Sequence, residues 1–214
     1  MAVIVVGGHS RSVGKTSVVA GIIAALPEMR WTAVKITQYG HGICSANGEP
    51  CDCATDDHAW AVTEERNRSG ESDSSRFLDS GAVRSLWVRT RQGMLAEAMP
   101  RLRKELASAE NAILESNSVM RFLRPELYVT VLDAANPDFK ASAKEYLDRV
   151  DAVILQNAKV IGHAVVWEQK VSLKPVQRKA IFHITPPPYV TAEIVDFVRE
   201  KILNLTQSNS PQSH

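Results

Sequence analysis

The chain has 214 residues, enough for one α/β domain with a sizeable core. Its 25 basic and 24 acidic residues nearly cancel, so the charge supports neither nucleic-acid binding nor binding to an anionic membrane. No apolar run approaches the roughly 20 residues needed to span a bilayer. The N-terminus leads directly into an apolar segment with no signal peptide before it, so we expect a cytoplasmic protein.

Apolar runs rich in β-branched residues alternate with helical segments, as in an α/β protein whose mostly parallel sheet carries helices on both faces. The predicted strands are Val3–Val6, Thr32–Ile36, Val83–Val88, Ala112–Glu115, Leu127–Leu132, Ala152–Leu155 and Ala180–Ile184. The predicted helices are Lys15–Leu26, Ser74–Ser80, Leu95–Ser108, Ala141–Arg149 and Thr191–Leu203. We expect a three-layer sandwich over residues 1–205 and a disordered polar tail over residues 206–214.

Residues 3–16 are the most informative part of the sequence, because they read as a strand, a phosphate-binding loop and the start of a helix. The loop follows the pattern G-x-x-x-x-G-K-[ST], except that His9 stands where the pattern has its first glycine. Backbone N–H groups at a helix N-terminus hold phosphates, and the helix dipole favours the anion. The residues predicted to hold the nucleotide here are Ser10, Arg11, Ser12, Val13, Gly14, Lys15, Thr16 and Ser17.

Two side chains of this motif have specific expected roles. Lys15 would reach the terminal phosphates, and the Thr16 hydroxyl would be a ligand of Mg²⁺. The strand Ala112–Glu115 ends in a carboxylate, and the carboxyl ends of parallel strands face the ligand crevice. Glu115 is therefore the first candidate for a catalytic and Mg²⁺-binding acid, and Asp133 is a rival for the same role.

Two more polar residues follow predicted strands. Lys35 ends the second strand, where its ammonium could neutralise charge on a transferring phosphoryl group, although a solvated lysine is the alternative. Asn157 follows the strand Ala152–Leu155 and could hydrogen-bond a purine base. The fuller base-reading pattern Asn-Lys-x-Asp is absent, so the sequence leaves both ATP and GTP open.

Residues 39–72 interrupt the alternation, and we expect them to form an inserted loop at the crevice. They hold all three cysteines, Cys44, Cys51 and Cys53, with His58 close by. An odd number of cysteines, two of them in a Cys-x-Cys pair, favours metal or redox chemistry over a disulfide framework. The set suits Zn²⁺ or, with a further ligand, an iron–sulfur cluster, while three unligated thiols are the alternative.

Two stretches of the chain resemble known proteins. The loop Gly8–Thr16, with the Ala-rich helix after it and the strand ending in Lys35, resembles the P-loop class that contains dethiobiotin synthetase and the cobyrinic acid amidating enzymes. The segment Asp73–Ala82 is similar to the Asp-Ser-x-Arg…Ala-Gly-Ala segment of the molybdopterin-guanine dinucleotide biosynthesis accessory proteins of the MobB type. Their turn after the second strand is matched by residues 39–42 and their Val-Glu-Gly strand end by Leu114-Glu115, with serine replacing the glycine.

The resemblance implies a P-loop sandwich, a homodimer, GTP as the nucleotide, and Mg²⁺ between Thr16 and either Glu115 or Asp73. The first functional hypothesis is thus a slow GTPase that assists molybdenum-cofactor maturation, together with the pterin cofactor or its biosynthetic proteins. Arg11 and Arg76 are candidates to supply transition-state charge in cis or across a dimer. His9 in the loop and the cysteine cluster are departures from the family pattern.

Three other functions remain open on the sequence. One is a metal-handling NTPase in which the nucleotide controls a metal at Cys51 and Cys53. Another is an ATP-dependent ligase of the dethiobiotin class, with Lys35 and Glu115 at the chemistry. The last is a nucleotide-binding scaffold with negligible turnover and a structural metal.

The metal expectation is tested by measuring metal content and the visible spectrum of protein purified without oxygen. We predict about one zinc ion or iron–sulfur cluster per chain or per dimer. The double variant Cys51→Ser/Cys53→Ser should lose it. Protein without metal in either form would contradict the expectation.

Overall fold

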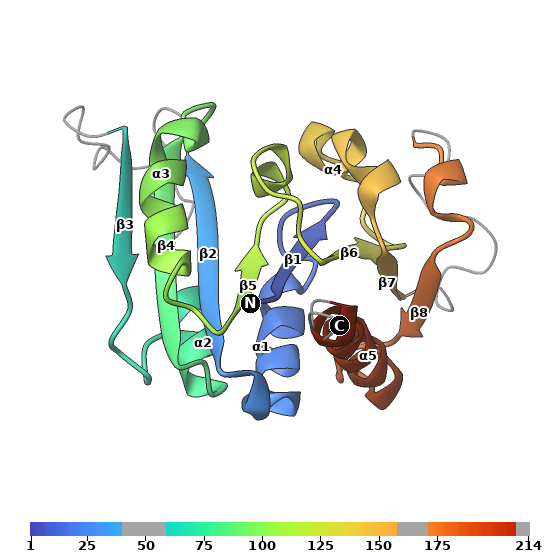
Figure 1. The fold of residues 1–214 in the computed structure, drawn as a ribbon. Coiled ribbons are helices and arrows are strands. Elements are labelled where there is room, and N and C mark those ends of the chain that lie inside the picture. Colours follow the sequence, from blue (N-terminus) through green and yellow to red (C-terminus); the bar gives the residue numbers. More distant parts are fainter. Residues whose placement is uncertain (40–58, 158–170, 209–214) are drawn as a thin grey trace, which may run out of the picture.

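The computed structural model of the protein describes residues 1–39, 59–157 and 171–208. Within these residues eight strands form one sheet in the spatial order β3-β4-β2-β5-β1-β6-β7-β8 (Figure 1). The strands are β1 (Val3–Gly8), β2 (Trp31–Tyr39), β3 (Trp60–Glu64), β4 (Arg84–Arg91), β5 (Asn111–Glu115), β6 (Leu127–Asp133), β7 (Ala152–Gln156) and β8 (Ala180–Ile184). Every pairing is parallel except β3 with β4, which is antiparallel.

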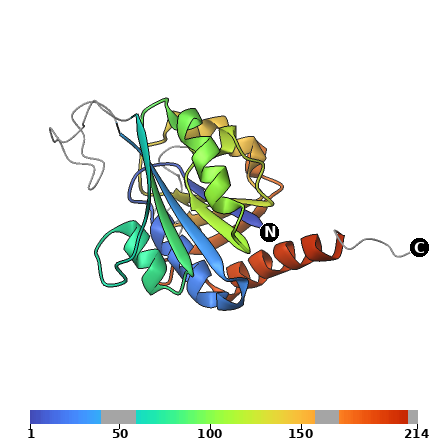
Figure 2. The ribbon, with the colours of Figure 1, turned by 60° about the vertical axis from the view of Figure 1, so that its left-hand side comes forward.

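Helices cover both faces of the sheet. The α-helices are α1 (Lys15–Ala25), α2 (Asp73–Asp79), α3 (Leu95–Leu106), α4 (Ala141–Glu145) and α5 (Ala192–Ser208). Short 3-10 helices are η1 (Pro27–Met29), η2 (Ser118–Arg121), η3 (Leu147–Arg149) and η4 (Lys174–Val176). Figure 2 shows α3 and α4 on one side of the sheet and α1, α2 and α5 on the other. The predicted mostly parallel α/β sandwich is confirmed.

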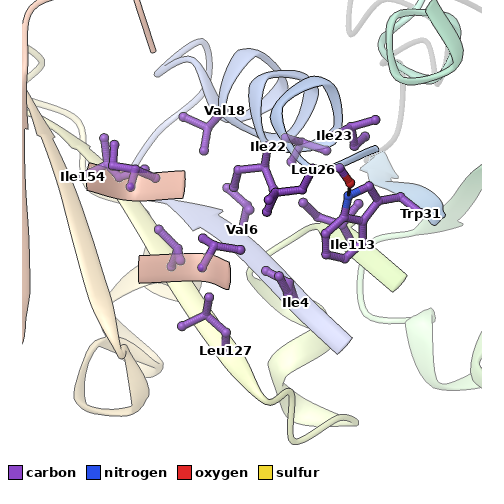
Figure 3. Packing of buried hydrophobic residues seen from close by; sticks show 14 of the residues in the cluster. Ile4, Val6, Val18, Ile22, Ile23, Leu26, Trp31, Ile113, Leu127 and Ile154 are labelled. Atoms are coloured by element: carbon purple, nitrogen blue, oxygen red, sulfur yellow. Dashed lines mark hydrogen bonds between the residues drawn. The ribbon is translucent and has the colours of Figure 1, made fainter. Parts of the chain in front are cut away.

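Two apolar clusters hold these layers together, one on each face of the sheet. The first joins β1, β5, β6 and β7 to α1 and α5, and Ile22 of α1 lies at its centre with no exposed surface. Trp31 begins β2 in this cluster, and its indole N–H donates to the Leu26 carbonyl at 2.9 Å (Figure 3). The second cluster packs α3, η2 and η3 against β2, β4 and β6. Burial on both faces explains why the central strands are nearly continuous apolar runs.

The structure differs from the sequence-based expectation in three places. Residues 60–64 of the expected inserted loop form the edge strand β3, because they pair with β4 and pack Trp60 and Val62 against the second cluster. The helix expected over Ala141–Arg149 ends at Glu145 and continues as η3. The last helix continues to Ser208, past residue 205, where the tail was expected to begin. Among the described residues, no helix is both long and apolar enough to cross a membrane.

The first cluster gives a stability prediction. Ile22→Ala removes buried methyl and methylene groups from a site with no exposed surface, so the free energy of unfolding should fall by about 2–5 kcal/mol. The matched control Leu203→Ala changes a side chain that is 47% exposed and should shift it by less than about 0.5 kcal/mol. Urea unfolding measures both. Equal effects of the two variants would contradict the assigned core.

Candidate nucleotide-binding site

The loop between β1 and α1 has the backbone that a phosphate-binding loop requires. Ser12 and Gly14 have positive φ values of 56° and 79°, and α1 begins directly afterwards at Lys15. A Cβ on Gly14 would lie 2.3 Å from the ring of Tyr189, so both the conformation and the packing exclude a side chain there. Gln156, at the end of β7, donates its amide to the Val13 carbonyl at 2.6 Å and holds the loop from the other side.

Lys15 lies along this loop. Its ammonium donates to the Ser10 carbonyl at 2.8 Å and makes no ion pair with a carboxylate of the described residues. Burial, together with the charges of the nearby Lys140 and Lys35, lowers the pKa of Lys15 to about 8 against the opposing effect of Glu115. A half-buried cation that bonds to a single carbonyl among the described residues gains from a negatively charged partner, and phosphate is the partner that this loop fits.

Next to Lys15, four side chains form a continuous chain of polar contacts. The Thr16 hydroxyl donates to Glu115 Oε2 at 2.8 Å, and Lys35 Nζ donates to Glu115 Oε1 at 2.6 Å. Lys35 also pairs with Asp73 at 2.5 Å. Glu115 is only 3% exposed, and these two donors provide a hydrogen bond to each of its carboxylate oxygens. The structure therefore brings Thr16, Lys35, Asp73 and Glu115 together beside Lys15.

Sheet pairing and helix capping explain this convergence. Lys35 and Glu115 are direct neighbours in the parallel pairing of β2 with β5. Asp73 is the first residue of α2, whose N-cap residue Ser72 accepts the backbone N–H of Ser75 at 3.1 Å. Burial disfavours the ammonium of Lys35, yet the carboxylates of Glu115 and Asp73 outweigh burial and hold its pKa above the usual value. Lys35 is thus a fixed cation in the site, not a solvated side chain.

The facing oxygens of Thr16 and Glu115 suit Mg²⁺. This ion takes hard oxygen ligands and commonly uses one or two protein oxygens together with phosphate oxygens. A hydroxyl and a buried carboxylate oxygen 2.8 Å apart, from the start of α1 and the end of β5, are of this kind. The carboxylate of Asp73 instead pairs with Lys35, and its Oδ1 lies 3.9 Å from Nη1 of Arg76. Thr16 and Glu115 therefore fit the ion better than Thr16 and Asp73.

The remaining expected loop residues lie around this centre. Ser10 is buried, and its hydroxyl donates to the Arg11 carbonyl at 3.0 Å. Arg11 and Ser12 are exposed, and Val13 is buried. The hydroxyl of Ser17 accepts from Arg76 at 3.2 Å, which joins α2 to α1.

Asp133 and Asn157 lie on the other side of β1 from Glu115. Asn157, with φ at 57°, donates its amide to Asp133 Oδ1 at 3.0 Å. Asp133 ends β6, and its backbone N–H donates to His9. Asp133 therefore belongs to the P-loop's support, whereas Glu115 contacts Thr16. The expected ligands Cys44, Cys51, Cys53 and His58 lie outside the described residues.

His9, a departure from the motif, is a fixed part of the loop. It is fully buried, its Nδ1–H donates to the Asp138 carbonyl at 2.6 Å, and its Nε2 accepts from the Asp133 backbone at 2.9 Å. An accepting Nε2 requires the neutral ring. Burial lowers the pKa of His9, while the Asp138 carbonyl and the Asp133 charge oppose that effect. The imidazole thus ties the loop to the segment after β6.

Sequence reasoning missed three further residues that support the loop. The side chain of Asn117 accepts the Gly8 N–H at 2.9 Å and donates to the Gly8 carbonyl at 2.8 Å. Asn136 donates to the Ser10 hydroxyl at 2.9 Å, and the Lys140 backbone N–H donates to the His9 carbonyl at 2.7 Å. Asn117 follows Glu115 by two residues, and that position after a strand end was the available signal. These contacts set the loop before any ligand arrives.

Positive charge gathers around the loop. Burial lowers the pKa of the Lys140 ammonium, and the charges of Arg11 and Lys35 lower it further. Lys140 and Lys35 also lower the pKa of Lys15. Mutual effects of this kind show that the cations share one region, where a polyphosphate would relieve their repulsion.

The parallel sheet, the loop from β1 to α1 and the Lys15–Thr16 helix start together give the chain the fold of P-loop NTPases. No protein-family profile and no curated protein sequence matches it. Solved structures similar to it include HypB from Helicobacter pylori in complex with nickel, at 16% identity and a TM-score of 0.48, covering 99% of this chain and 91% of that one. MobB from Bacillus subtilis matches at 16% identity and 0.40, covering 94% and 97%.

A further similar structure is LpxK from Aquifex aeolicus in complex with ATP, at 15% identity and a TM-score of 0.44. The match covers 86% of this chain and 53% of that one. Likeness at these identities concerns the fold alone.

The burial of neutral His9 gives a pH prediction. Its folded pKa lies below the 6.5 of an unfolded histidine, so the unfolded state binds more protons between the two values. The free energy of unfolding should fall as pH drops below about 6.5 through the folded pKa. Above 6.5 the contribution of His9 is complete. Urea unfolding between pH 4.5 and 8 measures the effect.

The variant His9→Phe removes the titrating ring and should reduce this slope while costing about 1–3 kcal/mol at neutral pH, because two backbone groups lose their partner. His183→Gln, at an exposed position of β8, is the matched control and should keep the wild-type slope. An unchanged slope in His9→Phe would show that His9 is not the group responsible.

Proposed function

We propose that the protein binds a nucleoside triphosphate with Mg²⁺ at this loop and hydrolyses it slowly. The observation that carries the proposal is the contact chain of Thr16, Glu115, Lys35 and Asp73, directly beside Lys15. Together with Lys15, it supplies oxygens for a cation and two ammonium groups for phosphate oxygens. Such an arrangement suits phosphoryl transfer, where catalysis is mostly positioning and charge stabilisation.

Each side chain has a definite part in this proposal. Lys15 exchanges the Ser10 carbonyl for phosphate oxygens, and Lys35 stabilises the charge that develops on the terminal phosphate. Thr16 and Glu115 would hold Mg²⁺, which would supply positive charge to neutralise the phosphate groups. Lys35 meanwhile holds the buried Glu115 in place through their ion pair at 2.6 Å.

Turnover is slow in this proposal because the two arginines near the loop need a partner to fix them. Arg11 is exposed, and Arg76 is exposed and directed to Ser17. Either could supply charge in cis or across the homodimer that the resemblance implies, once a partner fixes it. Sedimentation velocity with and without nucleotide tests the dimer.

The finer assignment to GTP and to molybdenum-cofactor maturation rests on the resemblance. Its support is the position of the resembling segment, because Asp73 begins α2 and pairs with Lys35 at the phosphate end of the site. Asn157, which donates to Asp133, is the residue proposed to hydrogen-bond the purine base. Preference for ATP, with no affinity for the pterin cofactor or its proteins, would count against this assignment.

An ATP-dependent ligase is the second candidate. It is favoured by Lys35, which two carboxylates hold in place at the position where a transferring phosphoryl group would lie. Formation of a phosphorylated carboxylic acid or carbamate, in place of simple hydrolysis, would select it. The hypothesis of a metal-handling NTPase depends on cysteines outside the described residues, and the metal content of the wild-type protein and the cysteine double variant tests it.

The Mg²⁺ and hydrolysis roles are tested with Glu115→Gln, which keeps the shape and removes the charge. Hydrolysis of GTP and ATP should fall about 100-fold or more. Lys15→Ala should weaken nucleotide binding about 10-fold or more, which corresponds to about 1.4 kcal/mol. Calorimetry measures binding, and phosphate release measures turnover.

The matched control is Glu126→Gln. Glu126 accepts the Val3 backbone N–H at the opposite end of β1, so its substitution should leave binding and turnover unchanged. Absence of binding of both GTP and ATP at millimolar concentration in the wild-type protein would overturn the proposal. Full turnover in Glu115→Gln would remove Glu115 from the mechanism.

A further inference from the structure

A row of polar side chains continues from the site across the same face of the sheet. On β2, Ala33 belongs to the first cluster, on the face that carries α1 and α2. Side chains alternate between the two faces of a sheet, so Lys35 and Thr37 point to the same face as Ala33. In the pairing of β2 with β4, Trp87 stands beside Lys35 and Arg89 beside Thr37. The indole N–H of Trp87 donates to the Thr37 hydroxyl at 3.1 Å.

Arg89 is held in place on this row. Its guanidinium carbon lies 4.7 Å from the centroid of the Trp87 ring, a stacked arrangement that orients the planar group. Its Nε is buried without a hydrogen-bond partner in the part of the chain that the structure describes. No carboxylate of that part pairs with it either.

Another arginine of the same strand has carboxylate partners. Arg84 of β4 pairs with both Glu64 and Glu105, at 2.8 and 2.9 Å. Arg89 is equally well oriented but lacks such partners among the described residues. A preorganised guanidinium that pairs with no carboxylate of residues 1–39, 59–157 and 171–208 can bind an oxyanion through two parallel hydrogen bonds.

The distance between Arg89 and the nucleotide site is comparable to the length of a small molecule. Arg89 lies one strand across and two residues along from Lys35. With a strand spacing of about 4.8 Å and a rise of about 3.3 Å per residue, their Cα atoms are about 8 Å apart. A molecule with an oxyanion at Arg89 would therefore place its other end beside Lys35 and Glu115. Trp87 and Thr37 lie between the two ends and are joined by their hydrogen bond.

We propose that Arg89, stacked on Trp87, binds the carboxylate or phosphate group of a second small-molecule ligand that lies between β4 and the nucleotide. This site rests on the proposed function, because it gives the nucleotide's terminal phosphate a neighbour that can accept it or regulate its hydrolysis. The ligand class is an anionic metabolite about 8 Å long.

The experiment follows the side-chain Nε–H signal of Arg89 by NMR in protein saturated with Mg²⁺ and a non-hydrolysable triphosphate analogue. The probes are inorganic phosphate and acetate, added separately. A saturable shift with at least one of them is expected, because an oxyanion at the outer guanidinium nitrogens changes the environment of the neighbouring Nε–H. Phosphate alone would assign a phosphate-bearing ligand, and a response to acetate would assign a carboxylate-bearing one.

Two variants make the test specific. Calorimetry measures the affinities of Arg89→Met, because this variant lacks the Nε–H that NMR follows. Arg89→Met keeps an unbranched stem beside Trp87 and should lower probe affinity at least tenfold, while nucleotide affinity changes less than twofold. Arg101→Gln removes an arginine of α3 that pairs with Glu105, and it should change neither affinity. Unaltered probe binding in Arg89→Met, or a shift at Arg89 no larger than that at Arg101, would overturn the proposal.

Failure of this site and failure of the nucleotide proposal are distinguishable. If the triphosphate analogue does not bind, the proposed function fails, and the probe titration is repeated on the nucleotide-free protein. If the analogue binds and the Arg89 signal does not respond, the second site alone is wrong.

Discussion

The buried carboxylate of Glu115 is the constraint on which the candidate site depends. It is only 3% exposed, and Thr16 and Lys35 donate hydrogen bonds to its two oxygens. Those donors come from α1 and β2, so one acid at the end of β5 fixes the start of the P-loop helix relative to its neighbouring strand. Asp73 extends the contact to α2 through Lys35.

A second set of contacts fixes the loop from the opposite side. His9 and Asn117 replace the freedom of a glycine-rich loop with hydrogen bonds to backbone groups of Asp133, Asp138 and Gly8. A loop supported in this way needs little rearrangement when phosphate arrives, which lowers the entropic cost of binding. The neutral state of His9 is part of that support, so acid weakens fold and loop together.

Much of this could be predicted from the sequence where local rules govern. Strand–loop–helix order and the carboxyl-end position of Glu115 and Lys35 follow from pattern and from parallel topology. The strand β3 was missed because five residues with two exposed side chains acquire their conformation from pairing with β4. The role of His9 was missed because its partners lie more than 120 positions away, and only the fold brings them together.

The most direct test of the account is a crystal structure of the protein with Mg²⁺ and a non-hydrolysable GTP or ATP analogue. The account predicts the terminal phosphates on the loop, Lys15 moved from the Ser10 carbonyl to phosphate oxygens, and Mg²⁺ held by Thr16 and Glu115. A nucleotide bound elsewhere, with Lys15 still on the Ser10 carbonyl and Thr16 still donating to Glu115, would contradict it.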